Sequence, residues 1–188
     1  LRRTVVAHPG RVRVIRNGVN TGEFAPAPDD GVLRRELGLN MERPVVGSIG
    51  RLEHIKGYDV MVESFALLLR QWTAPVRPAL VVAGDGSDLE GLRARVVELG
   101  LTQDIFMLGW RSDLTAMLRA FTIFTMTSRS EGTSVSLLEA MSTGLCPVVT
   151  NVGGNAAVLG SELTHRLVPS ADPGAIAEGW RVALAEEA

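Results

Sequence analysis

Short apolar runs alternate with helical patterns along most of this chain, and this alternation restricts the fold more than any other feature. Runs with the length and composition of buried strands stand at 44–49, 79–83, 105–108, 123–127, 147–150 and 165–168. Helical patterns fill the intervals, at 58–71, 87–99, 112–120, 134–142 and 173–188, with a weaker turn at 155–159. The run 79–83 is apolar at every position, as in a parallel strand that helices cover on both faces. The alternation predicts an α/β fold with a doubly wound, Rossmann-like parallel sheet, helices on both faces and strand order 3-2-1-4-5-6.

A different composition precedes this alternation. Residues 11–15 alternate like a short strand, residues 20–30 are rich in Pro, Ala and Asp, and a short helical pattern follows at 31–37. We therefore expect an N-terminal strand and interdomain linker over 1–30, and a ligand-binding domain over 31–188. The chain begins Leu-Arg-Arg-Thr, without an initiator Met or a signal-peptide pattern, so we expect a piece of a longer protein.

Composition excludes several classes of protein. The 188 residues are 46% apolar with a net charge of −2, which is ordinary for a soluble domain. This near-neutral balance argues against general nucleic-acid binding, which needs a basic face. Cys146 is the only cysteine, so no internal disulfide can form and a reducing, cytoplasmic compartment is expected. No apolar run reaches the length of about 20 residues that spans a bilayer.

Two turns flank the crevice that this topology predicts. In such a sheet, ligands bind outside the carboxyl ends of the strands, at the switch point between strands 1 and 4. The turn after strand 1 carries Gly50, Arg51 and Lys56, and two cations beside a glycine suit a diphosphate. The turn after strand 4 carries Glu131 and leads into a helix bearing Glu139. Small polar residues between the two acids can cap that helix, whose free N–H groups favour an anion.

Each of these features also has a plain structural interpretation. Arg51 and Lys56 are equally consistent with two solvated surface cations, and acids near a helix N-terminus are stabilising in their own right. Neither a P-loop nor the G-x-G-x-x-G fingerprint is present. Gly153-Gly154 can bring the backbone close to a ligand or simply turn the chain, and Trp110 can line a base pocket or cover the core. The three histidines lack metal-ligand spacing.

Short motifs in a fixed order give the chain a resemblance to one enzyme family. The motifs are Asn17-Gly18-Val19, Gly50-Arg51-Leu52 with Lys56-Gly57, Gly84-Asp85-Gly86, Leu108-Gly109, Ser130-Glu131-Gly132, Leu138-Glu139-Ala140-Met141 with Gly144, and Val152-Gly153-Gly154. With these motifs in this order, the chain resembles the C-terminal, donor-binding half of a retaining GT-B glycosyltransferase of the glycosyl transferases group 1 type. The chain departs from the commoner family pattern at Thr133-Ser134 and after Gly154.

The resemblance implies a role for each candidate residue. Arg51 and Lys56 would hold the diphosphate of a UDP-sugar or GDP-sugar, Glu139 the ribose, and Glu131 the donor sugar. The catalytic set would be Glu131, Arg51 and Lys56. The donor-binding set would be Gly50, Arg51, Lys56, Gly109, Trp110, Arg111, Glu131, Gly132, Thr133, Ser134, Leu138 and Glu139.

The resemblance also implies a setting. The enzyme would be a metal-independent hexosyl- or N-acetylhexosaminyltransferase of polysaccharide biosynthesis that needs no cofactor. Its acceptor half, absent from this chain, would supply any peripheral membrane association, and the isolated donor half would be inactive. A non-catalytic nucleotide-sugar-binding module and a GT-B sugar-nucleotide epimerase remain as alternatives. A glycoside hydrolase would use paired acids but has no need of the two cations.

Overall fold

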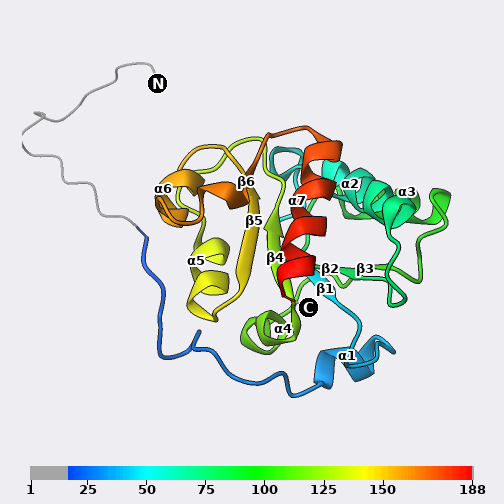
Figure 1. Ribbon diagram of the computed structural model, residues 1–188, viewed down its shortest axis with the longest axis horizontal. Coiled ribbons are helices and arrows are strands. Elements are labelled where there is room, and N and C mark those ends of the chain that lie inside the picture. The colour runs from blue at the N-terminus through cyan, green and yellow to red at the C-terminus, as the bar shows by residue number, and fades with distance from the viewer. Residues whose placement is uncertain (1–16, 188) are drawn as a thin grey trace, which may run out of the picture.

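Six parallel strands form one sheet in the computed structural model, which describes residues 17–187. The strands are β1 Val45–Ile49, β2 Ala79–Ala83, β3 Ile105–Met107, β4 Ile123–Met126, β5 Cys146–Thr150 and β6 Leu167–Val168. Their order is β3-β2-β1-β4-β5-β6, so β1 pairs with both β2 and β4 at the centre of the sheet. The predicted doubly wound topology and its switch point are confirmed (Figure 1).

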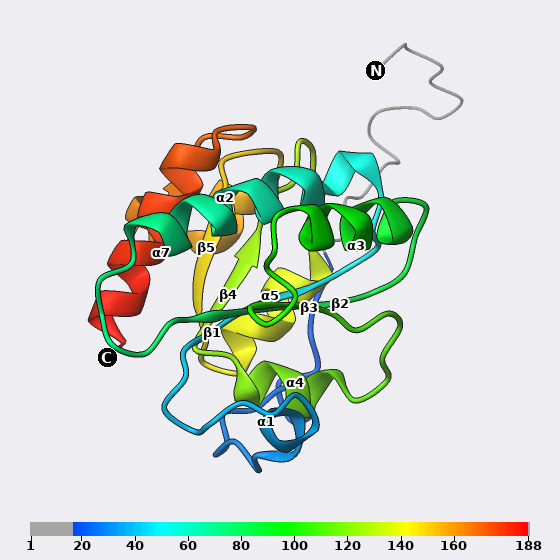
Figure 2. The same cartoon turned by 90° about the vertical axis from the view of Figure 1, so that its right-hand side faces the viewer.

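Helices cover both faces of the sheet. The helices are α1 Val32–Glu36, α2 Tyr58–Gln71, α3 Leu89–Glu98, α4 Leu114–Ala120, α5 Val135–Ser142, α6 Asn155–Leu159 and α7 Pro173–Glu186, with 3-10 turns at His54–Lys56 and Thr164–Arg166. Figure 2 shows α2, α3 and α7 in a first layer and α1, α4 and α5 in a second. Leu159 of α6 packs in the apolar cluster of the second layer. No helix within residues 17–187 is long and apolar enough to cross a membrane.

Strand residues alternate between these two layers. Val46 and Leu80 belong to the apolar cluster under α2, α3 and α7, whereas Val45 and Val81 belong to the cluster on the opposite face. Period-two alternation across a sheet buried on both sides explains why the strands read as unbroken apolar runs. Trp180 of α7 is fully buried, and its indole N–H donates to Thr125 Oγ1 at 2.8 Å.

The sixth strand is shorter than predicted. The run 165–168 was expected as a strand, but residues 164–166 form a 3-10 turn and only Leu167–Val168 pair with β5. Arg166 is buried within the expected run and forms an ion pair with Glu186. An edge strand has one partner at most, so it offers fewer ladder hydrogen bonds to offset such a competing contact.

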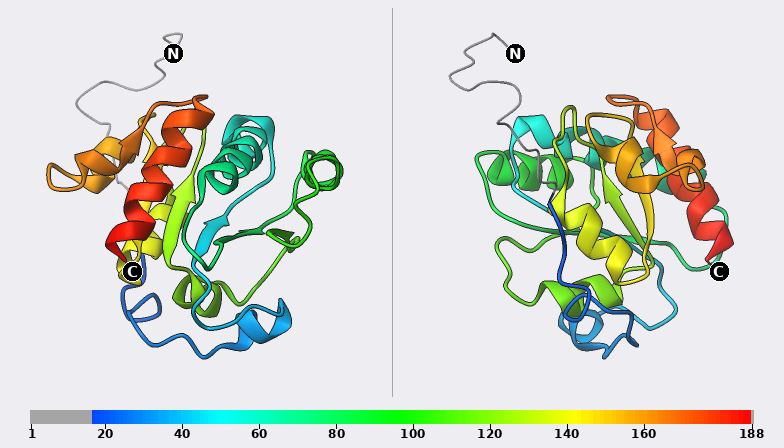
Figure 3. Two further views of the ribbon diagram at one scale, coloured as in Figure 1. Left: turned by 45° about the vertical axis from the view of Figure 1, so that its right-hand side comes forward. Right: turned by 90° about the vertical axis from the view of Figure 1, so that its left-hand side faces the viewer.

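The segment before α1 lies along the second layer. Figure 3 shows the course of this segment along the domain. Phe24 is buried among the side chains of that layer, and Pro26 lies beside Gly144 after α5. Residues 17–30 are therefore packed against the domain along part of their length. The division at residue 31 stays a prediction, and the strand expected at 11–15 lies outside the described residues.

We predict that Gly47→Ala destabilises the chain by roughly 1–3 kcal/mol or more. A methyl group on Gly47, inside β1, would lie 1.9 Å from Cδ2 of Phe121. The control is Gly91→Ala on exposed α3, where nothing lies within 4 Å, and it should stabilise by about 0.5–1 kcal/mol. Urea unfolding of the three proteins gives both differences. Equal effects of the two substitutions would contradict this account of the packing.

Candidate functional site

The loops that follow β1 and β4 meet at the switch point because these two strands are neighbours. Thr127, just after β4, donates through Oγ1 to the carbonyl of Gly57 at 2.8 Å. Gly57 directly follows Lys56, the last residue of the 3-10 turn. The position of Lys56 is thereby fixed relative to the loop that carries Glu131.

Arg129 makes a second connection between the same two loops. Its main-chain N–H donates to the carbonyl of Ile55 at 2.8 Å, and its guanidinium donates to the carbonyl of His54 at 2.7 Å. The same guanidinium holds both carboxylate oxygens of Asp59, at 2.8 and 2.6 Å. These hydrogen bonds keep the pKa of the Asp59 carboxyl below its usual value. Because the planar guanidinium of Arg129 donates to three acceptor atoms at once, it fixes the orientation of the loop.

Lys56 and Glu131 form an ion pair between the two loops. Lys56 Nζ donates to Glu131 Oε1 at 2.7 Å, and the Glu131 side chain is only 6% exposed. Ser128 Oγ donates to the same oxygen at 2.6 Å. The second oxygen, Oε2, accepts no hydrogen bond from residues 17–187. Glu131 is therefore held by one oxygen, and its other oxygen remains available as an acceptor.

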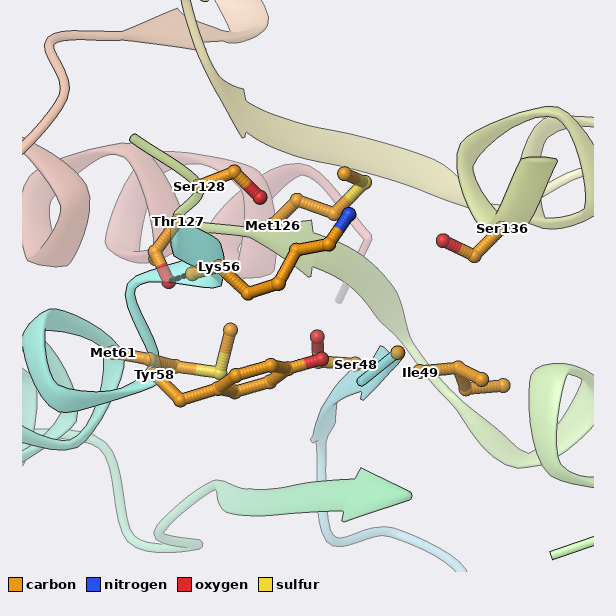
Figure 4. Close-up of a pocket in the computed structure, with 10 residues that line it drawn as sticks. Ser48, Ile49, Lys56, Tyr58, Met61, Met126, Thr127, Ser128 and Ser136 are labelled. Carbon is orange, nitrogen blue, oxygen red and sulfur yellow. Dashed lines mark hydrogen bonds between the residues drawn. The ribbon is translucent and has the colours of Figure 1, made fainter. Parts of the chain in front are cut away.

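A cavity of about 20 Å³ lies beside this pair, with room for about one water molecule. The ammonium of Lys56 and the hydroxyl of Ser136 point toward each other across it (Figure 4). Ser48 and Tyr58 line its floor, and Ser48 Oγ is buried without a hydrogen-bond partner among the described residues. Burial raises the pKa of Tyr58 to about 12, so its hydroxyl stays neutral. Ile49, Met61 and Met126 also line the cavity, so the hydroxyls and the ammonium lie among apolar side chains.

The N-terminus of α5 opens beside the same loop. Ser134 caps the helix, since its Oγ accepts from the N–H of Leu137 at 3.4 Å, as the sequence predicted. The other N–H groups of the first turn have no partner within the helix. The carbonyl of Thr133 accepts a hydrogen bond from Asn17 Nδ2 at 3.0 Å, so the chain that enters the domain is attached to this loop. Gly132 is exposed there. A first turn of this kind suits an anion.

Gly153 and Gly154 support the Glu131 loop from the side of β5. A Cβ on Gly153 would lie 1.8 Å from the carbonyl oxygen of Glu131, and one on Gly154 would lie 2.5 Å from that of Gly132. The N–H of Gly154 also donates to Gly132 O at 3.0 Å. The close approach expected for this pair is therefore made to the neighbouring main chain of the domain itself.

A larger cavity of about 460 Å³, a volume typical of small-molecule sites, lies on the other side of Gly50. Arg51, Gly84 and Trp110 are part of its lining, and Trp110 is 73% exposed. A Cβ on Gly84 would lie 1.8 Å from Gly50 O, so main chain packs on main chain here as well. Arg51 and Lys56, expected together, thus line two different cavities that share Gly50.

Ion pairs hold the two cations of the larger cavity, Arg51 and Arg111, to different degrees. The Arg51 side chain is 75% exposed and contacts Glu53 at 3.0 Å. Arg111 is bound on two sides, by Glu36 at 2.6 Å and by Asp113 at 2.7 Å. Gly109, next to Trp110, accepts a hydrogen bond from Gly84, which anchors this loop to the end of β2. Arg51 can turn toward a ligand, whereas Arg111 can do so only by giving up existing ion pairs.

Glu139 lies half-buried on α5, one turn beyond the cap, and its neighbour Leu138 is half-buried too. Burial, reinforced by the nearby Glu23, raises the pKa of the Glu139 carboxyl. No cation within residues 17–187 offsets these two effects. A carboxylate in this state is ready to accept hydrogen bonds from an incoming hydroxyl-bearing ligand.

Sequence reasoning assigned no role to Ser48, Tyr58 and Ser128, which the structure brings to the site, and considered Ser136 only as a possible helix cap. Only Ser128 had a signal that could have been used, because it stands three residues before Glu131 on the same loop. Ser48 and Tyr58 come from β1 and α2, and nothing local in the sequence links them to Glu131.

Comparison with known proteins identifies the relatives of this chain. The family model described as "Glycosyl transferases group 1" matches residues 29–188. A UDP-Gal:alpha-D-GlcNAc-diphosphoundecaprenol alpha-1,3-galactosyltransferase of Escherichia coli is 32% identical over 162 residues, 85% of this chain and 42% of that protein. A D-inositol 3-phosphate glycosyltransferase of Jonesia denitrificans is 32% identical over 189 residues, 96% of this chain and 45% of that protein. The chain spans a little under half the length of these relatives.

Solved structures share the fold. Anabaena Alr3699/HepE in complex with UDP-glucose superposes with a TM-score of 0.80 at 24% identity, over 93% of this chain and 48% of that one. The C-terminal domain of a glycosyl transferase group 1 family protein, LpcC, from Francisella tularensis has a TM-score of 0.75 at 23% identity. That match covers 89% of this chain and 88% of that one.

We predict that Glu139→Gln raises the melting temperature of the free chain at pH 7, by roughly 2 °C. A carboxyl whose pKa is raised on folding binds its proton more tightly in the folded chain, so its contribution to stability falls as pH rises through the folded pKa. The amide removes that penalty, and the difference should vanish at a pH below the unfolded value of about 4.3.

The matched control is Glu23→Gln, which removes the lesser of the two causes and should give a smaller rise. Calorimetric melts at a series of pH values measure both effects. Destabilisation by Glu139→Gln at pH 7 would contradict the prediction.

Proposed function

Because this chain belongs to the glycosyl transferases group 1 family, we propose that it is the donor-binding half of a retaining glycosyltransferase. The whole enzyme would move a sugar from a nucleotide-diphosphate sugar to an acceptor held by a second, N-terminal half. The observation that supports this most is the meeting of Lys56, Glu131 and the α5 N-terminus at the switch point of the sheet.

The proposed donor extends from Lys56 and the first turn of α5 into the larger cavity. Lys56 and the first turn of α5 would contact the diphosphate from one side, and Arg51 would turn in from the larger cavity. The base would lie in that larger cavity against Gly109, Trp110 and Arg111. Its volume of about 460 Å³ is ample for a nucleoside. The side chain of Trp110, being 73% exposed, offers an aromatic face for stacking.

The two glutamates would divide the remaining contacts. Glu139, on the helix and without a cation, would accept the ribose hydroxyls. Glu131, with one oxygen available, would accept a hydroxyl of the donor sugar. Main chain at Gly132, Thr133 and Ser134, with Leu138 behind it, would form the floor between these contacts.

Electrostatics supports transfer at this position. As the bond between sugar and phosphate breaks, negative charge grows on the departing diphosphate. Lys56, Arg51 and helix N–H groups would stabilise that charge. These groups would take the place of a metal ion, so we propose a metal-independent reaction. A hexosyl or N-acetylhexosaminyl donor linked to UDP or GDP, a place in cytoplasmic polysaccharide biosynthesis and peripheral attachment to a membrane through the acceptor half complete the proposal.

A thermal-shift panel of UDP-, GDP- and ADP-sugars tests donor binding directly. A ligand at 100 times its dissociation constant should stabilise the chain by about 2.7 kcal/mol. Weak binding is expected, because a donor in the whole enzyme would be enclosed from both sides. Failure of every nucleotide and nucleotide sugar to bind would overturn the proposal.

We predict that Arg51→Ala and Lys56→Ala each weaken binding of the preferred nucleoside diphosphate by roughly tenfold or more, as charge-assisted contacts are lost. Arg51→Ala is the cleaner test, since its side chain contacts only Glu53 within residues 17–187. Lys56→Ala also leaves the buried Glu131 without a cation and should lower stability.

The control for both is Arg181→Ala, an exposed cation on α7 paired with Glu178 and remote from both cavities. Isothermal calorimetry with UDP and GDP measures affinity, and urea unfolding measures stability separately. Unchanged affinity in Arg51→Ala and Lys56→Ala would refute their role with phosphate.

We predict that the longer protein containing this chain transfers sugar equally well with and without EDTA, and that this chain alone does not transfer. Water is not excluded from the reacting carbon without the facing half, and donor and acceptor are not held together. A radiolabelled donor assay on both proteins measures transfer. Loss of activity in EDTA would rule out the metal-free reaction, and robust transfer by this chain alone would rule out the need for a second half.

A further inference from the structure

Within residues 17–187, only one of the two carboxylate oxygens of Glu131 accepts hydrogen bonds. Both of its hydrogen bonds converge on Oε1, from Lys56 Nζ at 2.7 Å and from Ser128 Oγ at 2.6 Å. Oε2 has none within residues 17–187. The direction of Oε2 therefore depends entirely on what holds Oε1.

The two residues that donate to Oε1, Lys56 and Ser128, are not held equally firmly in place. Lys56 is 24% exposed, lines the cavity beside the pair and carries a mobile ammonium with three donors. A phosphate that comes close to Lys56 competes directly for that ammonium. When Lys56 shifts toward an anion, the Glu131 carboxylate, which is only 6% exposed, loses part of the positive charge that offsets its burial.

Ser128 is held in place far more firmly. It is 1% exposed, and its carbonyl accepts hydrogen bonds from Thr150 Oγ1 at 2.7 Å and from Ser170 Oγ at 3.2 Å. Thr150 is itself fully buried at the end of β5. The main chain of Ser128 is thus fixed to the sheet, which keeps its short side chain beside Oε1 of Glu131.

We propose that Ser128 is a positioning residue that keeps Oε1 of Glu131 in place so that Oε2 faces the donor sugar. This rests on the proposed function, and deepens it by assigning the recognition of the sugar to the Ser128–Glu131 pair and that of the phosphate to Lys56. Without the Ser128 hydroxyl, Glu131 would follow Lys56 when a diphosphate binds. The nucleotide would still bind, while the sugar attached to it would no longer be distinguished.

The experiment compares nucleotide and nucleotide sugar on the same variants. Ser128→Ala removes the hydroxyl, Ser128→Cys replaces it with a weak donor of similar size, and Ser128→Thr retains it. Ser130→Ala is the control, an exposed serine on the same loop whose side chain makes no hydrogen bond within residues 17–187. Calorimetry measures affinities for UDP, UDP-glucose and UDP-galactose, or for GDP and GDP-mannose if wild type prefers guanine.

Ser128→Ala and Ser128→Cys should change affinity for the free nucleotide less than twofold, and should weaken the nucleotide sugar by roughly tenfold, as for one lost hydrogen bond to a charged group. Ser128→Thr and Ser130→Ala should match wild type. A merely structural role would weaken nucleotide and nucleotide sugar together.

The outcomes separate this inference from the proposed function. If wild type binds no nucleotide, the proposed function fails. If wild type prefers a nucleotide sugar and Ser128→Cys keeps that preference, the positioning role is wrong while the proposed function stands. Should Ser128→Ala fail to fold, Ser128→Cys and Ser128→Thr decide the question.

Discussion

The hydrogen bonds between the loops after β1 and β4 determine the geometry of the whole site. Thr127 and Arg129 donate from one loop to the carbonyls of residues 54, 55 and 57 on the other. Strand pairing brings the loops near each other, but these bonds set the separation between Lys56 and Glu131. Each bond uses a main-chain carbonyl as acceptor, so the frame tolerates replacement of the side chains on the β1 loop.

The site contains partly buried carboxylates, which lower the stability of the fold. Glu139 is half-buried beside Glu23, which raises its pKa, and Glu131 is almost fully buried beside one ammonium. A domain selected for stability alone has no use for an unpaired, partly buried carboxylate. Such groups make sense when a ligand completes their hydrogen bonds, which is the common trade-off between stability and activity.

The fold was largely predictable because its signals are local. Helix 58–71 and strand 79–83 agree with the structure to the residue, since apolar spacing and flanking Gly and Pro define their ends. The strand predicted at 165–168 was too long, because hydropathy does not reveal that the side chain of Arg166 forms an ion pair with Glu186. The site was predictable in its location and much less in its contacts. Lys56 and Glu131 stand 75 residues apart, and no local pattern encodes which cavity Arg51 or Lys56 lines.

The glycines that bring main chain against main chain, at Gly84 beneath Gly50 and at Gly153-Gly154 beside the Glu131 loop, separate two tasks within the domain. Peptide groups, whose dimensions are the same whatever the sequence, set the spacing of the β1 loop from the β2 loop and of the β4 loop from the β5 loop. Outward side chains such as Arg51, Thr133 and Ser130 are not involved in that spacing. Mutation can therefore change the surface presented to a ligand without moving the frame beneath it. A scaffold of this kind can acquire a new substrate by single substitutions, with no need to be rebuilt.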